Sequence, residues 1–323
     1  MLKKLKALLL IPLILLSAGG CAPKSEPIQR SGNYFDTVIT VTLYRPDQEK
    51  YLDGCFKLAR KYEDYFSTTI ADSDISKINS ANGSPVNVHK ETADIIKKSL
   101  EYSRLTGGCF DISVGALSSL WQDAIKKKEV PDDAAIKAAV ATIDYTKISV
   151  EGSTVSTAPG QKLDLGGIAK GYIADKMKAY LEKNKVTSGL INLGGNVLTL
   201  GKKPDGSDYV IGIKKPFTEN GETVDTLNVI NRSVVTSGTY ERYFKKDGTI
   251  YHHILDLKTG YPVDNDLDSV TIISDKSTDG DALSTSCFLL GEEKAKELLK
   301  SLKNVDAIFV HKDLSESKTD NDY

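Results

Sequence analysis

The sequence predicts an α+β protein. Helical patterns are concentrated in residues 47–141, whereas strand patterns are concentrated in residues 188–274. This segregation is typical of α+β folds, because a parallel α/β fold alternates the two kinds of element along the chain. There is no internal repeat, and about 300 residues are enough for one large domain or two closely packed domains.

Residues 1–20 are typical of a secretion signal. A basic start precedes an apolar run at 7–16, which is too short to span a bilayer comfortably. Small residues then lead to Cys21, and this ending is similar to the lipobox of bacterial lipoproteins. We expect cleavage before Cys21 and lipidation of its thiol; an ordinary signal peptide with an incidental cysteine is the alternative. Residues 21–32 are polar and contain prolines, as in a short tether.

The first half of the folded chain is expected to be mainly helical. Residues 34–44 alternate and are rich in β-branched and aromatic side chains, which predicts one strand. Apolar residues then recur at helical spacing in several segments, of which the second is stopped by Gly107 and Gly108. The expected helices cover 47–66, 90–105, a segment around Trp121, and 132–142. A polar loop with a helical turn is expected at 67–83, and a hairpin at 147–156.

The second half is expected to be mainly extended. Two strands surround Gly194 and Gly195, and a hairpin turns at Asp247 and Gly248. Further strands are expected at 209–214, 226–231, 233–237, 269–274 and 307–310. Two late helices, 280–290 and 292–302, are separated by Gly291.

Composition excludes some classes of function. The chain is 40% hydrophobic and 27% charged, with a net charge of −2, so no basic excess favours nucleic acid. Besides Cys21 it contains Cys55, Cys109 and Cys287. They are far apart and odd in number, so they indicate neither a disulfide framework nor a zinc site. Cys55 and Cys287 have apolar neighbours and are expected in the core.

A two-glycine turn at 166–167 is the first candidate site. It follows a short predicted strand at 162–165 and precedes a helix from about Ile168. The start of a helix offers N–H donors to an anion such as a phosphate. Asp164 stands just before the turn, and Lys170 stands in the first helical turn. The alternative is that this turn only reverses the chain.

The segment 280–287 is the second candidate. On a helix, Asp281 and Thr285 share a face, with Ser284 beside them. A carboxylate and hydroxyls are hard oxygen ligands that suit Mg²⁺ better than a transition metal. The alternative is that Asp281 only places a negative charge at the start of a helix.

Adjacent histidines, His252 and His253, form the third candidate. Neighbours on a strand point to opposite faces, so only one of them can face a shared site. Such a histidine could act as a general base or donate to a phosphate. A half-buried structural histidine is the alternative. The other two histidines, His89 and His311, are expected at the surface.

Taken together and in order, five motifs resemble the ApbE family, the FAD:protein FMN transferases. They are 164–172, 192–196, 237–243, His253 with Thr259-Gly260, and 281–285. The resemblance extends from about residue 34 to residue 310. It implies a T-fold-like α+β domain at 33–312, an antiparallel sheet with packed helices, followed by a disordered tail at 313–323.

The resemblance also implies an activity. Such a protein would use FAD and Mg²⁺, transfer FMN to a Thr or Ser hydroxyl of an exported flavoprotein through a phosphoester bond, and release AMP. It would be lipid-anchored at the extracytoplasmic face of the bacterial cell membrane. The alternatives are an FAD pyrophosphatase that yields FMN and AMP, and a flavin-binding lipoprotein.

Roles for single residues follow from matching positions in that family. His253 matches the histidine with a catalytic role. The residue matching Gly167 gives a backbone carbonyl to the metal, and the other metal ligands match Asp281, Ser284 and Thr285. The cofactor-binding positions match Phe35, Cys109, Phe110, Asp111, Asp164, Lys170 and Ile254. Two positions depart from the family: Thr69 replaces a frequent aromatic residue, and Cys109 replaces a small Ala or Ser.

Overall fold

The computed structural model describes residues 26–218 and 221–319. The predicted signal peptide, the lipidation site at Cys21 and the last residues of the predicted tail, 320–323, lie outside this part of the chain. Within it, no helix has the length and apolar character needed to cross a lipid bilayer.

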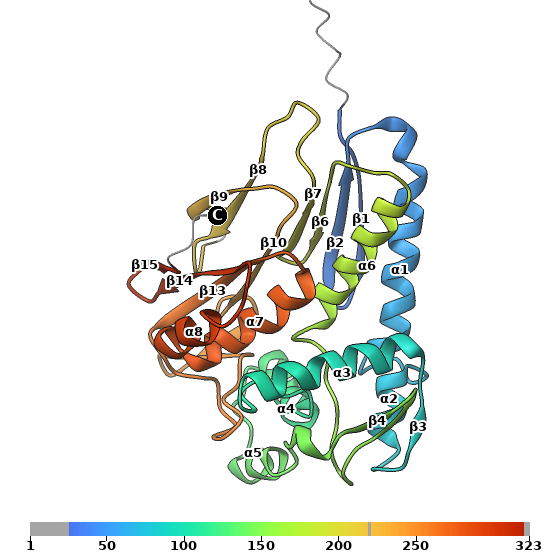
Figure 1. Ribbon diagram of the computed structural model, residues 1–323. Helices are drawn as coiled ribbons and strands as arrows, with labels where there is room; N and C mark the ends of the chain where they lie inside the picture. Colours follow the sequence, from blue (N-terminus) through green and yellow to red (C-terminus); the bar gives the residue numbers. More distant parts are fainter. Residues whose placement is uncertain (1–25, 219–220, 320–323) are drawn as a thin grey trace, which may run out of the picture.

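An eight-stranded antiparallel sheet forms the centre of the fold (Figure 1). Every pair of neighbouring strands in it is antiparallel. In spatial order the strands are β1 (Ile28–Tyr34), β2 (Thr37–Leu43), β6 (Gly189–Leu193), β7 (Asn196–Leu200), β10 (Ser233–Gly238), β13 (Leu267–Ser274), β14 (Val305–His311) and β15 (Glu316–Lys318).

The sheet is covered on both faces at its centre. Val270 and Ile272 of β13 belong to the main core, whereas Ile273 points to a second apolar cluster on the other face. The main core includes α6 (Ala169–Lys183) and α7 (Ser277–Leu290), with α1 (Lys50–Phe66) against α6 and α8 (Glu292–Leu299) against α7. The second cluster lies under the hairpin of β8 (Tyr209–Lys214) and β9 (Thr223–Val229). Burial on both faces explains the nearly continuous apolar sequence of β13.

A smaller group of elements lies at one end of the sheet, below it in Figure 1. It contains α2 (Asp74–Ser80), α3 (Lys90–Leu105), α4 (Gly115–Lys127), α5 (Asp133–Val140), and a small sheet of β3 (Val86–Asn87), β5 (Thr154–Ser156) and β4 (Ser149–Glu151). The hairpin of β11 (Tyr243–Lys246) and β12 (Thr249–His252) packs on α4 and α5 through Phe244, Leu255 and Trp121. Short 3-10 helices occur at Pro46–Gln48 and Tyr145–Lys147.

Four predictions about the elements are wrong. Residues 34–44 are not one strand, because the chain reverses at Phe35 and Asp36, which both have φ of 54°. Strand β1 begins inside the predicted tether, and β15 lies inside the predicted disordered tail. The predicted strand at 162–165 is reduced to a single bridge between Lys162 and Val114.

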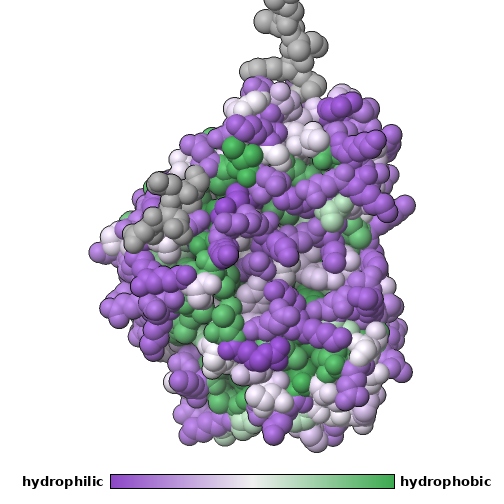
Figure 2. All heavy atoms as spheres, viewed as in Figure 1, coloured by the Kyte–Doolittle hydropathy of each residue, from purple (hydrophilic) through white to green (hydrophobic). Residues whose placement is uncertain are grey.

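The view in Figure 2 shows a surface dominated by hydrophilic side chains, with apolar side chains in smaller separate areas. Among the described residues, the three cysteines are free thiols, and Cys55 and Cys287 are fully buried as expected. The fold is therefore held by its apolar core and its sheet, without help from disulfides in this part of the chain.

Candidate functional site

The contact between α6 and α7 positions the carboxylate of Asp281. Gly171 of α6 faces α7 so closely that a Cβ atom there would lie 2.1 Å from the carbonyl oxygen of Ser277. Because this glycine has no side chain, its amide can donate to Oδ2 of Asp281 at 2.9 Å. Lys170 donates from Nζ to the other oxygen, Oδ1, at 3.2 Å. Asp281 is only 3% exposed, so both contacts compensate a buried charge.

The two-glycine turn lies directly before α6. Its conformation is fixed by Asp164, whose Oδ1 accepts from the amide of Gly166 at 2.8 Å and whose Oδ2 accepts from Ser118 at 2.6 Å. Gly167 then comes close to α7, because a Cβ atom at this residue would lie 3.9 Å from Oγ1 of Thr285. The turn and the helix 281–285 are thus neighbours, as the sequence analysis required of a shared site.

Three hydroxyl groups meet between α7 and β10. Oγ of Ser237 lies 2.8 Å from Oγ of Ser284 and 3.2 Å from Oγ1 of Thr285. Ser284 also donates to the carbonyl oxygen of Asp281 at 3.1 Å. Ser237 was not predicted as a site residue. It lies in the motif 237–243, but nothing in that motif indicates that β10 passes beside α7.

His253 enters the same region from the end of β12. Its amide donates to the carbonyl of Arg242 at 3.1 Å. Part of the residue is accessible to solvent, but Nδ1 is buried and has no hydrogen-bonding partner among the described residues. Burial lowers the pKa of His253 to about 3, and the positive charges of Arg242 and Lys170 lower it further in the same direction. The imidazole is therefore neutral at physiological pH and within the field of Lys170.

His252 points elsewhere, as expected for the neighbour of His253 on a strand. Its Nε2 lies 3.1 Å from the carbonyl oxygen of Val263, and its Nδ1 accepts from the amide of Ile254 at 3.3 Å. Burial lowers the pKa of this histidine to about 4. Both ring nitrogens of His252 thus have backbone partners, so His252 has a structural position and His253 stays the candidate for the site.

The predicted flavin-binding residues fall into two groups. Phe110 is buried against Gly167, with its ring 3.1 Å from the position of a Cβ atom there, and Sγ of Cys109 lies 3.9 Å from the carbonyl of Ser286. These two residues lie beside the α6–α7 junction. The carboxylate of Asp111 instead accepts from Ser113 and from the amide of Tyr145, and burial raises the pKa of this carboxyl.

The second group consists of residues at turns. Among the described residues, none of them forms a hydrogen bond with Asp281. Phe35 is at the β1–β2 turn, where its amide donates to Glu63. Ile254 is buried just after β12. Thr69, the departure from the family, donates its amide to Ser67 in the turn after α1. The flavin contacts of all seven predicted positions stay predictions.

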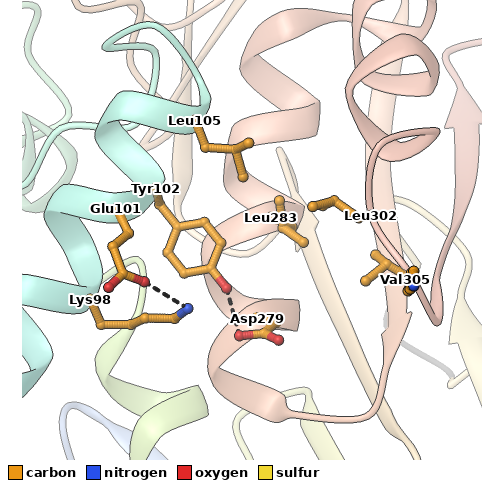
Figure 3. A pocket seen from close by; sticks show the side chains of 9 residues that line it. Lys98, Glu101, Tyr102, Leu105, Asp279, Leu283, Leu302 and Val305 are labelled. Atoms are coloured by element: carbon orange, nitrogen blue, oxygen red, sulfur yellow. Dashed lines mark hydrogen bonds and ion pairs between the residues drawn. The ribbon is translucent and has the colours of Figure 1, made fainter.

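Two cavities lie away from these residues. The first cavity, of about 320 Å³, lies between α3 and α7. Figure 3 shows the side chain of Tyr102 pointing from α3 toward Asp279 of α7. The hydroxyl of Tyr102 donates to Asp279 at 2.6 Å. The other, of about 390 Å³, lies beside β12. Of the candidate site residues, only His252 lines one of these two cavities, the second.

The donor set fits a hard divalent cation. Asp281 carries a carboxylate and Ser284 and Thr285 carry hydroxyls, all hard oxygen donors, and Gly167, whose carbonyl the resemblance adds to the set, lies beside Thr285. Within 26–218 and 221–319 there is no group of three His, Cys, Asp or Glu side chains that could hold a metal ion. A metal at the α6–α7 junction would thus depend on hydroxyl and carbonyl oxygens in addition to the single carboxylate of Asp281.

Comparisons with known proteins identify the family of this chain. A model of the ApbE family matches residues 35–309. The chain belongs to the ApbE family. A relative named FAD:protein FMN transferase from Klebsiella pneumoniae (strain 342) is 42% identical over 278 residues, which cover 85% of this chain and 86% of the relative. A relative of the same name from Treponema pallidum (strain Nichols) is 35% identical, with 93% of this chain and 89% of the relative covered.

Solved structures of ApbE proteins share the fold. The ApbE protein of Thermotoga maritima is similar with a TM-score of 0.83 and 29% identity, covering 91% of this chain and 97% of the other. The flavinyl transferase ApbE of Pseudomonas stutzeri, in its apo form, gives a TM-score of 0.81 and 27% identity, covering 91% and 95%. The predicted family, the α+β fold and the assignment as a transferase are confirmed.

Proposed function

We propose that this protein transfers FMN from FAD to a Thr or Ser hydroxyl of an exported flavoprotein, with Mg²⁺ as cofactor and AMP as the second product. One observation carries the proposal. The buried carboxylate of Asp281 meets Lys170, and Thr285 of the same helix lies beside the two-glycine turn. The names of the relatives, FAD:protein FMN transferase, support the same reaction.

The metal would be held by the carbonyl of Gly167, the carboxylate of Asp281 and the hydroxyls of Ser284 and Thr285. A bound Mg²⁺ supplies positive charge that stabilises the negative charge developing on a pyrophosphate during phosphoryl transfer. Ser237 orients the two hydroxyls, because its own hydroxyl lies within hydrogen-bonding distance of both.

The protein's own groups handle the nucleophile and the phosphates. The acceptor hydroxyl oxygen forms a bond to the riboflavin-side phosphorus, the bond from that phosphorus to the bridging oxygen breaks, and AMP leaves with the electron pair. We assign His253 as the acceptor of the hydroxyl proton: its imidazole is neutral, and the negative charge of a bound pyrophosphate would raise its pKa from about 3 toward the range in which a general base is effective. Lys170, on the first turn of α6, holds a phosphate oxygen together with the amides at the start of that helix.

The proposed location is the extracytoplasmic face of the cell membrane, with the protein anchored by a lipid on Cys21. This part of the proposal rests on the sequence of residues 1–21 alone. It is consistent with an exported acceptor, which would meet the enzyme on the same side of the membrane.

The experiment that tests the reaction compares Asp281→Ala, His253→Ala and Asp279→Ala. Each protein is incubated with FAD, Mg²⁺ and an exported acceptor protein, and both covalent flavin and AMP are measured. We expect His253→Ala to lower turnover by about 10²–10⁴-fold, the usual contribution of a general base. We expect Asp281→Ala to remove the response to Mg²⁺.

Asp279→Ala is the matched control, because this carboxylate lies on the same helix and binds Tyr102 instead of the site. It should keep the Mg²⁺ response. Negligible effects of both site variants would contradict the proposal. AMP release that is as fast without the acceptor as with it would instead indicate an FAD pyrophosphatase.

A further inference from the structure

The β11–β12 hairpin presents an open backbone edge beside His253. In this antiparallel pair, His252 lies opposite Tyr243 and Ile250 lies opposite Lys245. The amide of His253 donates to the carbonyl of Arg242, so that pair is hydrogen-bonded. Hydrogen-bonded and non-hydrogen-bonded pairs alternate along an antiparallel ladder. The N–H and C=O groups of Ile250 and His252 therefore point away from β11.

The returning chain covers only part of this outer edge. Residues 261–263 run back beside 254–256, and backbone hydrogen bonds of 3.0 and 2.8 Å join the two segments. Across the described residues, no further backbone hydrogen bond engages Ile250 or His252 on this side. Ile250 and His252, the two residues of β12 whose backbone groups could pair with an added strand, therefore have no backbone partner on this edge within the described chain.

The cavity of about 390 Å³ lies along the open edge. It is lined by the continuous segment 248–252, by the returning segment 261–265, and by residues that include Thr239, Asp268 and Lys312. Thr249 is exposed, Ile250 is half-buried and His252 is buried. The edge therefore runs from the exposed Thr249 inward to the buried His252, the residue directly before His253.

We propose that the acceptor protein docks by adding an extended segment to the open edge of β12. This inference rests on the proposed function, because FMN transfer requires a protein hydroxyl to reach His253. An extended segment offers free N–H and C=O groups to Ile250 and His252, whereas the backbone groups of a helix are already bonded to each other. Side chains of the added strand alternate between two faces. A Ser or Thr of the added strand that lies on the same face of the hairpin as His253 then has sequence neighbours on the opposite face, where His252 lies.

A peptide experiment tests the pairing directly. The full-length protein, FAD and Mg²⁺ are combined with an extended peptide that contains a Thr hydroxyl, either unmodified or N-methylated at one of the two alternating sets of amides. Only one set of amides donates to an added partner strand. We expect methylation of that set to raise the acceptor KM by about tenfold or more, and methylation of the other set to change it little.

Equal behaviour of the two methylated peptides would overturn the docking mode while leaving the proposed function intact. Absence of flavin on the unmodified peptide, and on every exported acceptor protein offered in its place, would overturn the proposed function itself and the docking mode with it. The two failures are therefore distinguishable in one assay.

The protein offers a matched pair of variants for the same question. Ile250 and Lys245 are register partners, and each directs its N–H outward, on opposite edges of one hairpin. Proline is tolerated at such positions because it removes only the outward donor. We expect Ile250→Pro to raise the acceptor KM by about tenfold, with unchanged FAD binding by flavin fluorescence, and Lys245→Pro to leave both unchanged. Equal acceptor KM values for the two variants would overturn the docking mode.

Discussion

Single residues at this site have more than one task. Asp281 is offered as a metal ligand, yet its two oxygens also accept from Gly171 and Lys170 and so tie α7 to α6. Asp164 similarly accepts from Gly166 and from Ser118 of α4. A buried carboxylate needs such partners, because an unpaired charge in the interior is costly. The acids of the site therefore also hold its parts in place.

Ser237→Ala tests the part of the site that the sequence analysis missed. Without this hydroxyl, Ser284 and Thr285 each lose the hydrogen bond to Ser237 that they have in common. We expect the Mg²⁺ concentration for half-maximal activity to rise by about tenfold, as for other outer-shell partners of metal ligands. Titration of activity with Mg²⁺ measures it.

Ser233→Ala is the control for that variant. Ser233 lies on the same strand, and its buried hydroxyl has no partner among the described residues. This variant should titrate with Mg²⁺ like the unmodified protein. An unchanged titration for Ser237→Ala would show that Ser237 does not orient the ligands.

The two adjacent histidines make stability depend on pH. Their pKa values fall from an ordinary 6.5 to about 4 for His252 and about 3 for His253 when the protein folds. Below pH 6.5 the unfolded chain therefore binds more protons than the folded protein, so the free energy of unfolding decreases as the pH is lowered toward 4. Each fully titrating histidine contributes a slope of up to about 1.4 kcal/mol per pH unit.

Urea unfolding between pH 7 and pH 4.5 measures this slope. We expect His252→Gln to reduce the slope relative to the unmodified protein, whatever its effect on stability at neutral pH. The same slope in both proteins would contradict the assignment of a neutral, buried His252.

At the level of elements, the close approach of α6 and α7 depends on one glycine. A Cβ atom at residue 171 would meet the backbone of Ser277 at 2.1 Å and the Cβ of Asp281 at 2.8 Å. Alanine gains about 1 kcal/mol of helix propensity over glycine, but backbone atoms cannot move aside as a flexible side chain does. We expect Gly171→Ala to destabilise the protein by about 1–3 kcal/mol net and to lower Mg²⁺-dependent activity.

Ala179→Gly is the control that separates a loss of helix stability from a change in the spacing of α6 and α7. Ala179 is exposed on the same helix, so this change costs about 1 kcal/mol through propensity alone. Denaturant unfolding should show a loss of stability in both variants, whereas the activity assay should show a loss only in Gly171→Ala. Full activity of folded Gly171→Ala would contradict the link between helix spacing and the site.

Elements with strong local signals were predicted well. The helix 90–105 has the bounds of α3, because apolar spacing and the following glycines define both ends. The β1–β2 turn was missed because Phe35 and Asp36 adopt positive φ without a glycine, so the usual hairpin signal is absent. The strand β1 was missed because its burial comes from pairing with β2 and packing on α1, which its polar sequence does not reveal.

At the scale of the whole molecule, the site is assembled from distant parts of the chain. Lys170 and Asp281 are separated by 111 positions, and Ser118 and Asp164 by 46. Residue chemistry alone indicated each candidate weakly, and only the order of motifs in a family connected them. Ser237 and Gly171 could not be assigned from the sequence, since their roles arise where β10 and α6 pass beside α7.

Anchoring is also a property of the whole chain. If Cys21 carries the lipid, Cys21→Ser should move the protein from the membrane fraction to the soluble exported fraction. The folded domain does not depend on that thiol, so binding of FAD should be unchanged. Fractionation of cells that produce each form measures this, and a variant that stays with the membrane would contradict the lipid anchor.

The two outer strands of the central sheet cover its inner strands, which prevents those strands from pairing with another copy of the protein. β1 and β15 occupy its edges, and both come from segments that resemble a tether and a tail in sequence. The next strands inward, β2 and β14, are more apolar, and β14 is buried along nearly its whole length. An uncovered apolar strand is a template for pairing between copies of a protein. A version trimmed to residues 33–312 would lose both covers and become prone to self-association and precipitation.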